Sequence, residues 1–527
     1  MTVGARESVA GQRIEAVLRA GLLPLGLPIF VAVVALVLAT LARMPPIPSD
    51  QLNYLEFARD LPDVPQIPAV YHQYQRVGLV LPLALAIKVV GYTTTAYYLV
   101  PILASVALAL AVYFLGALLF NRVAGAAAAV FVVGNSAIFV DLAAPLPDLL
   151  AAALFCWAMV LTIAIRQGQP RLTATQQRRI GALVGIGVLL GWSYLTREFI
   201  VLLWPLVPLL LVRPVGTRGL AWVALPLVMI GIGELVLNAY LYEDPLARVR
   251  SVLGHGEGPM SSAALSAYRD QDRLWYANRL PEALREFPEG GWLWGFLVVT
   301  MGGSTIWPTH RLLLVWVACM AVPLSLLGGV IEPAEPMLRL TNFRYWFPII
   351  PAIVLGGVGG AWLATRWVVG RLLASPGLRD TVAGVIAIAV VVTPLAAASE
   401  AREHDPRYVA AGAVQLDELR TWLVTGKDPV ERLWADARTS RILRLIAAAP
   451  RGEDRWDGDI LTLAADGAEP KPGDHVLLYS EGRGICSRCR DALERALGSP
   501  VSISESWTPV FATDDGIARV FEVAPSP

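Results

Sequence analysis

Long apolar stretches separated by short polar turns fill the first three quarters of the chain. Each stretch is about 20 residues long, the length that a helix needs to cross a ~30 Å hydrocarbon core. The pattern predicts a polytopic α-helical membrane protein with about eleven spans. The predicted spans are residues 22–42, 97–119, 123–140, 147–165, 181–196, 199–212, 219–241, 291–307, 312–330, 346–365 and 381–398.

The first apolar stretch, Leu22 to Ala42, follows three arginines and is long for a signal peptide, so we expect a retained first helix. A shorter stretch, Val77 to Gly91, contains Pro82 and Lys88. At about 14 residues it is too short to span comfortably, and we expect it to be interfacial or re-entrant.

Arginine is distributed unevenly between the turns. Alternate turns are rich in arginine and nearly free of acidic residues, whereas the long loops 43–96 and 242–290 are mixed in sign. The arginines of the first group are Arg122, Arg166, Arg171, Arg178, Arg179, Arg213, Arg218, Arg311, Arg366, Arg371 and Arg379. Because cytoplasmic loops carry the excess of basic residues, the N-terminus is predicted to be cytoplasmic. An odd number of spans then places the C-terminal region outside.

From Ser399 onward the pattern changes to short alternating strand-like and helix-like segments. Strands are predicted at 432–435, 475–479, 507–512 and 517–523, and helices at 414–423, 439–449 and 488–497. Asp514-Asp515-Gly516 is typical of a turn. We therefore expect two domains: a membrane domain over residues 1–398 and a soluble extracytoplasmic α/β domain over residues 399–527.

Composition supports this division. Charged residues make up 16% of the chain and hydrophobic residues 55%, whereas soluble domains carry about 25% charged residues. The formal net charge is zero, which argues against a nucleic-acid partner. Rich use of arginine, alanine and valine is associated with high-GC bacteria.

The four cysteines indicate little about chemistry. Cys156 and Cys319 lie inside predicted spans, and Cys486 and Cys489 form a Cys-Ser-Arg-Cys segment in the outer domain. A zinc site would need a second pair of ligands. A local disulfide is the simpler interpretation of the outer pair, and a thiol-redox role is the alternative.

Four groups of charged residues lie at predicted outer ends of spans, where burial near lipid is costly and often functional. They are Asp50 after the first span, Asp148 at the fourth, the adjacent Arg197 and Glu198, and Arg344 beside Tyr345. Each group also has a structural interpretation. Either acid can favour a helix N-terminus, the adjacent pair can form an ion pair, and the last arginine can extend from an aromatic interfacial belt.

A second set of polar residues is less specific. Glu234 and Asn238 lie one helical turn apart in the seventh span and share a face, so they line a cavity or pair between helices. His72, Arg76, His255 and Glu257 lie in the two long outer loops, where solvated loop residues are the default.

The predicted topology brings Asp50, Asp148, Arg197 and Arg344 to the same membrane surface. Arginine binds a lipid phosphate by paired hydrogen bonds, and a carboxylate can act as general base on a hydroxyl. A sugar attached to a lipid phosphate fits such a site.

At these residues the chain resembles the GT-C superfamily of membrane glycosyltransferases, in the branch of protein O-mannosyltransferases and lipid A aminoarabinose transferases. Five short segments carry the resemblance: Asp50-Gln51-Leu52-Asn53-Tyr54, Arg76 through Gly91, Asp148, Leu195-Thr196-Arg197, and Arg344-Tyr345-Trp346-Phe347-Pro348. Gln51 stands where the family usually has a second acid, which weakens the case for a metal on adjacent carboxylates. A divalent cation is possible and not obligatory.

The resemblance implies transfer of a hexosyl or pentosyl group from a polyprenyl-phosphate donor, with inversion, at the outer face of the cell membrane. Asp50 would be the general base and Asp148 a second acid of the site. Arg197, Arg344 and Tyr345 would hold the donor phosphate. The substrate cavity would be lined by Tyr54, His72, Arg76, Glu198, Glu234, His255 and Glu257. The acceptor would be a lipid, a glycan or a protein. The alternatives are a transporter or flippase of lipid-linked sugars and a non-catalytic assembly subunit.

Overall fold

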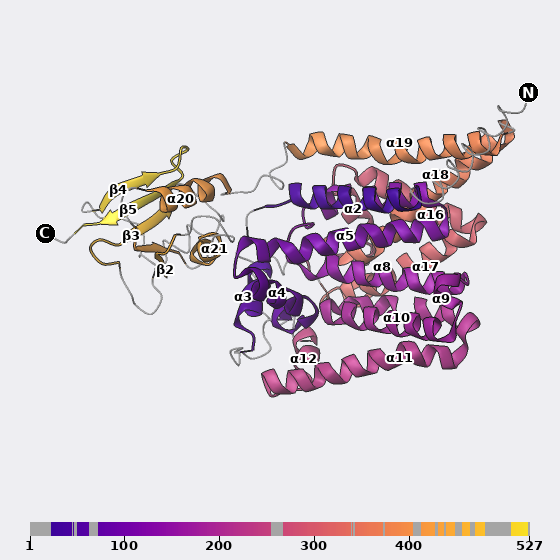
Figure 1. The fold of residues 1–527 in the computed structure, drawn as a ribbon, viewed down its shortest axis with the longest axis horizontal. Helices are drawn as coiled ribbons and strands as arrows, with labels where there is room; N and C mark the ends of the chain where they lie inside the picture. The colour runs from indigo at the N-terminus through magenta and orange to yellow at the C-terminus, as the bar shows by residue number, and fades with distance from the viewer. Residues whose placement is uncertain are drawn as a thin grey trace, which may run out of the picture.

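The computed structural model describes residues 23–44, 46, 50–62, 72–253, 267–338, 340, 343–372, 375–403, 413–426, 430–436, 439–447, 456–463, 470–479 and 507–524. Figure 1 shows a bundle of long helices lying side by side, with a small sheet domain at one end. We call this end of the bundle the outer end, after the predicted topology.

Ten helices make up most of the bundle. They are α2 (Leu23–Leu41), α5 (Thr94–Leu119), α6 (Arg122–Gly134), α8 (Pro147–Arg166), α10 (Gln176–Thr196), α11 (Leu206–Tyr242), α16 (Gly290–Ile306), α17 (Pro308–Ser325), α18 (Ile350–Leu372) and α19 (Pro376–Glu403). In the described part of the chain, 7 helices are long and apolar enough to cross a membrane, and three shorter apolar helices accompany them. The chain is a multi-pass membrane protein, and the count of about eleven spans stays a prediction.

The long helix α11 consists of two halves. Gly216 has φ 65° and ψ −179°, which no helix contains, so the chain reverses there. The Arg179 guanidinium, at the inner end of α10, donates to the Pro214 carbonyl. The 3₁₀ helix η2 (Glu198–Leu203) and the first half of α11 therefore return the chain to the inner end, as predicted for separate spans at 199–212 and 219–241.

Small residues let α18 approach its neighbours closely. A Cβ added at Gly357 would lie 2.2 Å from the Phe296 ring on α16, and one added at Gly359 would lie 2.2 Å from the Phe120 ring. The 3₁₀ helix η5 (Phe343–Ile349) leads directly into α18. This packing therefore fixes the position of Arg344 at the outer end.

Three short helices cover the outer end next to the sheet domain: α3 (Asp50–Asp60), η1 (His72–Gln75) and α4 (Val77–Val90). The 14 residues of α4 coincide with the stretch expected to be interfacial or re-entrant. Leu52, Leu55 and Leu83 of these helices share one apolar core with Leu416 and Ile442 of the C-terminal domain. The two parts of the chain are therefore joined by packed side chains.

The C-terminal domain is a five-stranded sheet flanked by α20 (Ala413–Thr425) and α21 (Thr439–Ile446). The strands are β1 (Arg432–Ala435), β2 (Asp459–Thr462), β3 (His475–Tyr479), β4 (Trp507–Ala512) and β5 (Ala518–Val523), in the order β2-β1-β3-β5-β4. β1 pairs in parallel with β2 and β3, and β5 pairs antiparallel with β3 and β4.

This arrangement confirms the predicted strands at 432–435, 475–479 and 507–512, and the predicted turn before β5, where Gly516 has φ 66°. β2 was not predicted. The predicted helix 488–497 and the Cys486–Cys489 segment lie outside the described residues, and Cys156 and Cys319 are free thiols.

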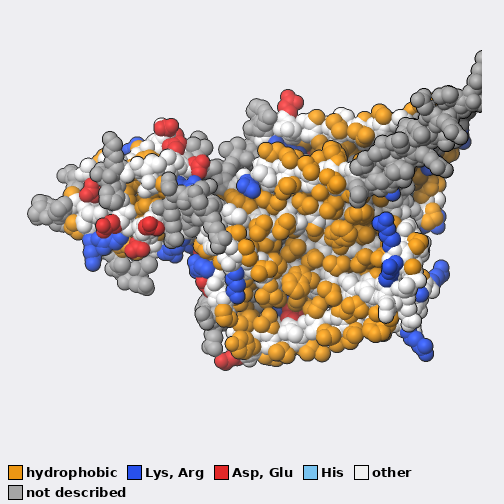
Figure 2. Space-filling view, in the orientation of Figure 1, with side chains coloured by type: hydrophobic (Ala, Val, Ile, Leu, Met, Phe, Trp, Pro, Cys, Tyr) orange, Lys and Arg blue, Asp and Glu red, His pale blue; other side chains and the backbone are white. Residues whose placement is uncertain are grey.

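The surface of the bundle carries a broad apolar belt. Figure 2 shows hydrophobic side chains over the length of the helices and basic side chains at the end opposite the sheet domain. This is the distribution that the alternation of arginine-rich turns predicts.

Candidate active site

Asp50 is the first residue of α3 and faces the outer end of the bundle. Its carboxylate accepts a hydrogen bond from the Gln73 amide at 3.0 Å and lies 3.6 Å from an Arg344 guanidinium nitrogen. The Asp50 side chain is 31% exposed and that of Arg344 is 25% exposed. Both groups are therefore accessible from solvent while held by neighbours.

Tyr54 lies one turn after Asp50 on α3 and is fully buried. Its hydroxyl oxygen accepts a hydrogen bond from Arg76, the residue before α4. Arg76 in turn pairs with Glu198 at 3.2 Å. These contacts join α3, α4 and the α10–η2 turn beneath Asp50.

A second arginine, Arg248, also pairs with the Glu198 carboxylate. Arg248 on α12 (Ala247–Leu253) lies 3.4 Å from Glu198 and 2.7 Å from Glu234, and its guanidinium covers the Tyr194 ring at 4.4 Å. Asn238, one turn after Glu234, is also buried. Through its pair with Arg248, Glu234 connects α11 to the outer loop 242–290.

Asp148 and Arg197 form a buried pair. Pro147 starts α8, so Asp148 lies in its first turn, where a carboxylate is favoured by the helix dipole. Its oxygen lies 2.9 Å from Arg197 Nε, and the two side chains are 3% and 8% exposed. Arg197 also lies over the Phe199 and Tyr345 rings at 4.8 and 5.0 Å. The adjacent Arg197 and Glu198 thus have separate partners, and the self-contained ion pair considered from the sequence is wrong.

The electrostatics of the site show which groups are held neutral and which are held charged. Burial raises the pKa of the Tyr54 phenol to about 12, against the opposing effect of Arg76. Tyr54 therefore keeps its proton at neutral pH. Burial by itself would raise the pKa of Glu198, but the surrounding arginines, Arg76 first, hold that pKa well below its usual range.

Asp141 lies in the turn between α7 (Ser136–Phe139) and α8 and was not predicted from the sequence. Burial raises the pKa of its carboxyl to about 7. Arg344 lowers this pKa and Asp148 raises it further. Asp141 is the acid of the cluster whose charge changes near neutral pH.

The C-terminal domain contacts α3 directly. Arg441 on α21 donates from Nε to a Glu56 carboxylate oxygen at 2.9 Å and from a terminal nitrogen to the Asn53 side-chain oxygen at 2.8 Å. Asn53 lies one turn from Asp50, so this contact holds the helix that carries Asp50.

The structure brings together Asp50, Tyr54, Arg76, Asp148, Arg197, Glu198, Glu234, Arg344 and Tyr345 at the outer end. His72 begins η1, and His255 and Glu257 lie outside the described residues. Gln73, Asp141 and Arg248 were missed. A search for any polar residue in the two long outer loops would have included Gln73 and Arg248, but such residues are common there.

Within the described residues no group of three His, Cys, Asp or Glu side chains is arranged to hold a metal ion. Near Asp50 and Asp148 the partners are Arg344 and Arg197. A divalent cation therefore has no set of carboxylates ready for it in this part of the chain.

Comparison with known proteins identifies the fold. Residues 79–238 match the model of the dolichyl-phosphate-mannose-protein mannosyltransferase family. Two crystal structures of ArnT from Cupriavidus metallidurans, one bound to undecaprenyl phosphate and one in the apo state, superpose with a TM-score of 0.55 at 13% and 14% identity. They cover 95% of this chain and 99% and 98% of their own. The chain has the GT-C fold. No curated protein sequence gives a significant match.

The GT-C fold extends over both parts of the chain, because the ArnT superposition covers nearly its whole length. The oligosaccharyltransferase of Archaeoglobus fulgidus also matches, with a TM-score of 0.49 at 12% identity over 80% of this chain and 63% of that one. The family match includes Asp148, Arg197, Glu198 and Glu234. The family match and the ArnT superposition confirm the resemblance to the GT-C superfamily that the sequence suggested.

Proposed function

We propose that the protein is a glycosyltransferase that moves a hexosyl or pentosyl group from a polyprenyl-phosphate donor to an acceptor hydroxyl at the outer membrane face. The family match to mannosyltransferases and the ArnT structure bound to undecaprenyl phosphate support this class of reaction and donor. A lipid, glycan or protein would supply the hydroxyl.

One observation carries the assignment of the general base. The Asp50 side chain is 31% exposed, whereas the Asp148 side chain is 3% exposed and pairs with Arg197. An acceptor can therefore reach Asp50 and not Asp148. Asp148 acts as a positioning residue that holds Arg197 in place.

The proposed reaction is a direct displacement at the anomeric carbon of the donor. Asp50 takes the proton from the acceptor hydroxyl, and the oxygen attacks the anomeric carbon of the donor. The bond from that carbon to the phosphate oxygen breaks, the phosphate keeps the electron pair, and the configuration inverts. The products are the glycoside, the polyprenyl phosphate and protonated Asp50.

In this reaction Arg344 stabilises the leaving phosphate, because a hydrogen-bond donor that is already in position best stabilises the charge that develops there. Its guanidinium is partly exposed beside Asp50. Arg197, stacked between Phe199 and Tyr345, supplies a second positive charge behind it. Tyr54 is fully buried and keeps its proton, and it supports the site from beneath through its contact with Arg76.

A transporter or flippase of lipid-linked sugars is not favoured. Transporters place their substrate sites near the bilayer midplane between repeats, and the charged cluster here lies at the end of the bundle with α3 and η5. A non-catalytic assembly subunit would tolerate loss of the Asp50 charge.

The test is transfer by purified Asp50→Asn protein from a polyprenyl-phosphate sugar, measured beside a thermal melt. We expect turnover to fall by about 10²-fold or more, the usual worth of a positioned base, with an unchanged melt. Asp60→Asn is the matched control, since Asp60 ends the same helix and is exposed beside Arg59. The control should keep full turnover. Full turnover in the Asp50 variant would contradict the proposal.

A further inference from the structure

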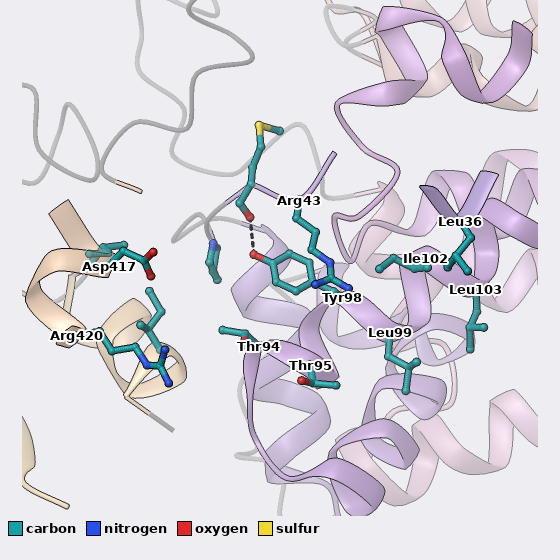
Figure 3. Close-up of a pocket in the computed structure, with 14 residues that line it drawn as sticks. Leu36, Arg43, Thr94, Thr95, Tyr98, Leu99, Ile102, Leu103, Asp417 and Arg420 are labelled. Atoms are coloured by element: carbon teal, nitrogen blue, oxygen red, sulfur yellow. Dashed lines mark hydrogen bonds between the residues drawn. The ribbon is translucent and has the colours of Figure 1, made fainter. Parts of the chain in front are cut away.

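A groove separates the membrane bundle from the C-terminal domain on the side of α2 and α5. We call it the interdomain groove; its volume is about 890 Å³. Figure 3 shows its walls, with Arg43, Thr94, Thr95 and Tyr98 on the bundle side and Asp417 and Arg420 across from them. The charged cluster around Asp50 contributes no residue to its lining, so it is a separate site.

The inner part of the groove is apolar and exposed on the surface of the bundle. Leu36 on α2 and Leu99, Ile102 and Leu103 on α5 line it, and Leu36 and Leu103 are 49% and 59% exposed. From Thr95 to Leu103 the helix rises about 12 Å along the bundle axis. This wall therefore extends from the outer end of α5 into the apolar belt and suits an acyl chain lying along the helices.

The outer part of the groove is basic. Arg43 is exposed, and its guanidinium carbon lies 5.4 Å from the centre of the Tyr98 ring, whose hydroxyl donates to the Met44 carbonyl at 2.7 Å. Among the described residues, no carboxylate lies within ion-pair distance of Arg43. Arg420 lines the opposite wall, and Asp417 is the acidic residue of this lining.

We propose that the interdomain groove binds one anionic phospholipid from the outer leaflet. Its phosphate contacts Arg43 and Arg420, and its upper acyl chain lies against Leu36, Leu99 and Leu103. Two arginines above an apolar wall match the division of a phospholipid into a charged head and an apolar tail. Because the two arginines belong to different parts of the chain, the lipid holds the C-terminal domain against the bundle.

The experiment is native mass spectrometry of the full chain in detergent with added phosphatidylglycerol or phosphatidylcholine. We expect one phosphatidylglycerol to remain bound to the unaltered protein. Arg43→Gln and Arg420→Gln should each lower its affinity by about fivefold, the worth of one basic side chain at an anionic surface, and the double variant by about 25-fold. Arg171→Gln, an exposed arginine at the opposite end of the bundle, is the control and should bind as before.

Three outcomes would overturn the proposal. Equal retention of phosphatidylglycerol in the double variant would show that the arginines do not hold it. Equal affinity for phosphatidylcholine would remove the role of headgroup charge. A rise in KM for the polyprenyl-phosphate donor in the double variant would mean that the groove admits the donor; unchanged donor KM with lost phosphatidylglycerol supports the proposal.

Discussion

Arg344 offers a direct test of how the donor phosphate is bound. We expect Arg344→Ala to weaken donor affinity by about tenfold or more, because a charged hydrogen-bond donor beside the phosphate is lost. Arg344→Lys should weaken it less, since lysine keeps the charge and loses the planar fork. Donor binding by the purified variants is the measurement.

The pattern across the two Arg344 variants separates the interpretations. Equal loss in both would show that the fork, and not the charge alone, is needed. If neither variant loses donor affinity, Arg344 does not bind the donor and belongs to the aromatic belt formed with Tyr345 and Trp346.

The raised pKa of Asp141 predicts that the free energy of unfolding depends on pH. The pKa of this carboxyl in the folded protein, about 7, lies above its ordinary value of 3.8, so between these pH values the folded protein binds a proton that the unfolded chain has released. The stabilisation is fully present below about pH 4 and is lost as pH rises through 7. Asp141→Asn should therefore raise the melting temperature at pH 8 and raise it much less at pH 4. A shift that is equal at both pH values would contradict this assignment.

The site residues that were predicted from the sequence share one property. Asp50, Asp148, Arg197 and Arg344 each lie where an apolar stretch begins or ends, so the topology alone brings them to one face. Their partners were not predictable, because the Asp148–Arg197 pair and the contacts of Gln73 and Arg248 depend on how helices pack sideways.

At the scale of elements, α3 is held between the bundle and α21. Arg441 contacts Glu56 and Asn53 there, and both ion-pair partners are about a quarter exposed. We expect Arg441→Glu to lower kcat by about three- to tenfold with little change in donor KM, because α3 then presents Asp50 less accurately. Measured kcat and KM of purified variants check this.

A charge exchange is the control for Arg441. The double variant Glu56→Arg with Arg441→Glu restores opposite charges and should recover most of the lost kcat. If the exchange recovers nothing while the thermal melt is intact, the ion pair does not position α3.

The strands that were predicted from the sequence are those with a clear local pattern of residues. β1, β3 and β4 are apolar or β-branched runs between turn residues, and all three were predicted at their observed bounds. β2 (Asp459–Thr462) is as short as β1, but it lies at the edge of the sheet and two of its four residues are polar. Its strand geometry comes from parallel pairing with β1 and not from its own sequence.

At the scale of the whole molecule, the orientation in the membrane is a prediction. The arginine-rich turns lie at the end of the bundle opposite the C-terminal domain, which should therefore be extracytoplasmic. A reporter that is active only in the cytoplasm, fused after Pro527, should stay silent. A bright signal would reverse the topology and place the Asp50 site on the cytoplasmic side.

The order in which the chain is made has a consequence for the contact of Arg441 with Glu56. The two residues are 385 positions apart, so at 5–20 residues per second Arg441 is synthesised roughly 20–80 s after α3. Asp148 and Arg197 belong to neighbouring helices and can neutralise each other early. Asp50 must wait for Arg344, and α3 must wait for Arg441 on α21. The nascent protein therefore holds an incomplete site at the membrane surface until Arg441 has been synthesised.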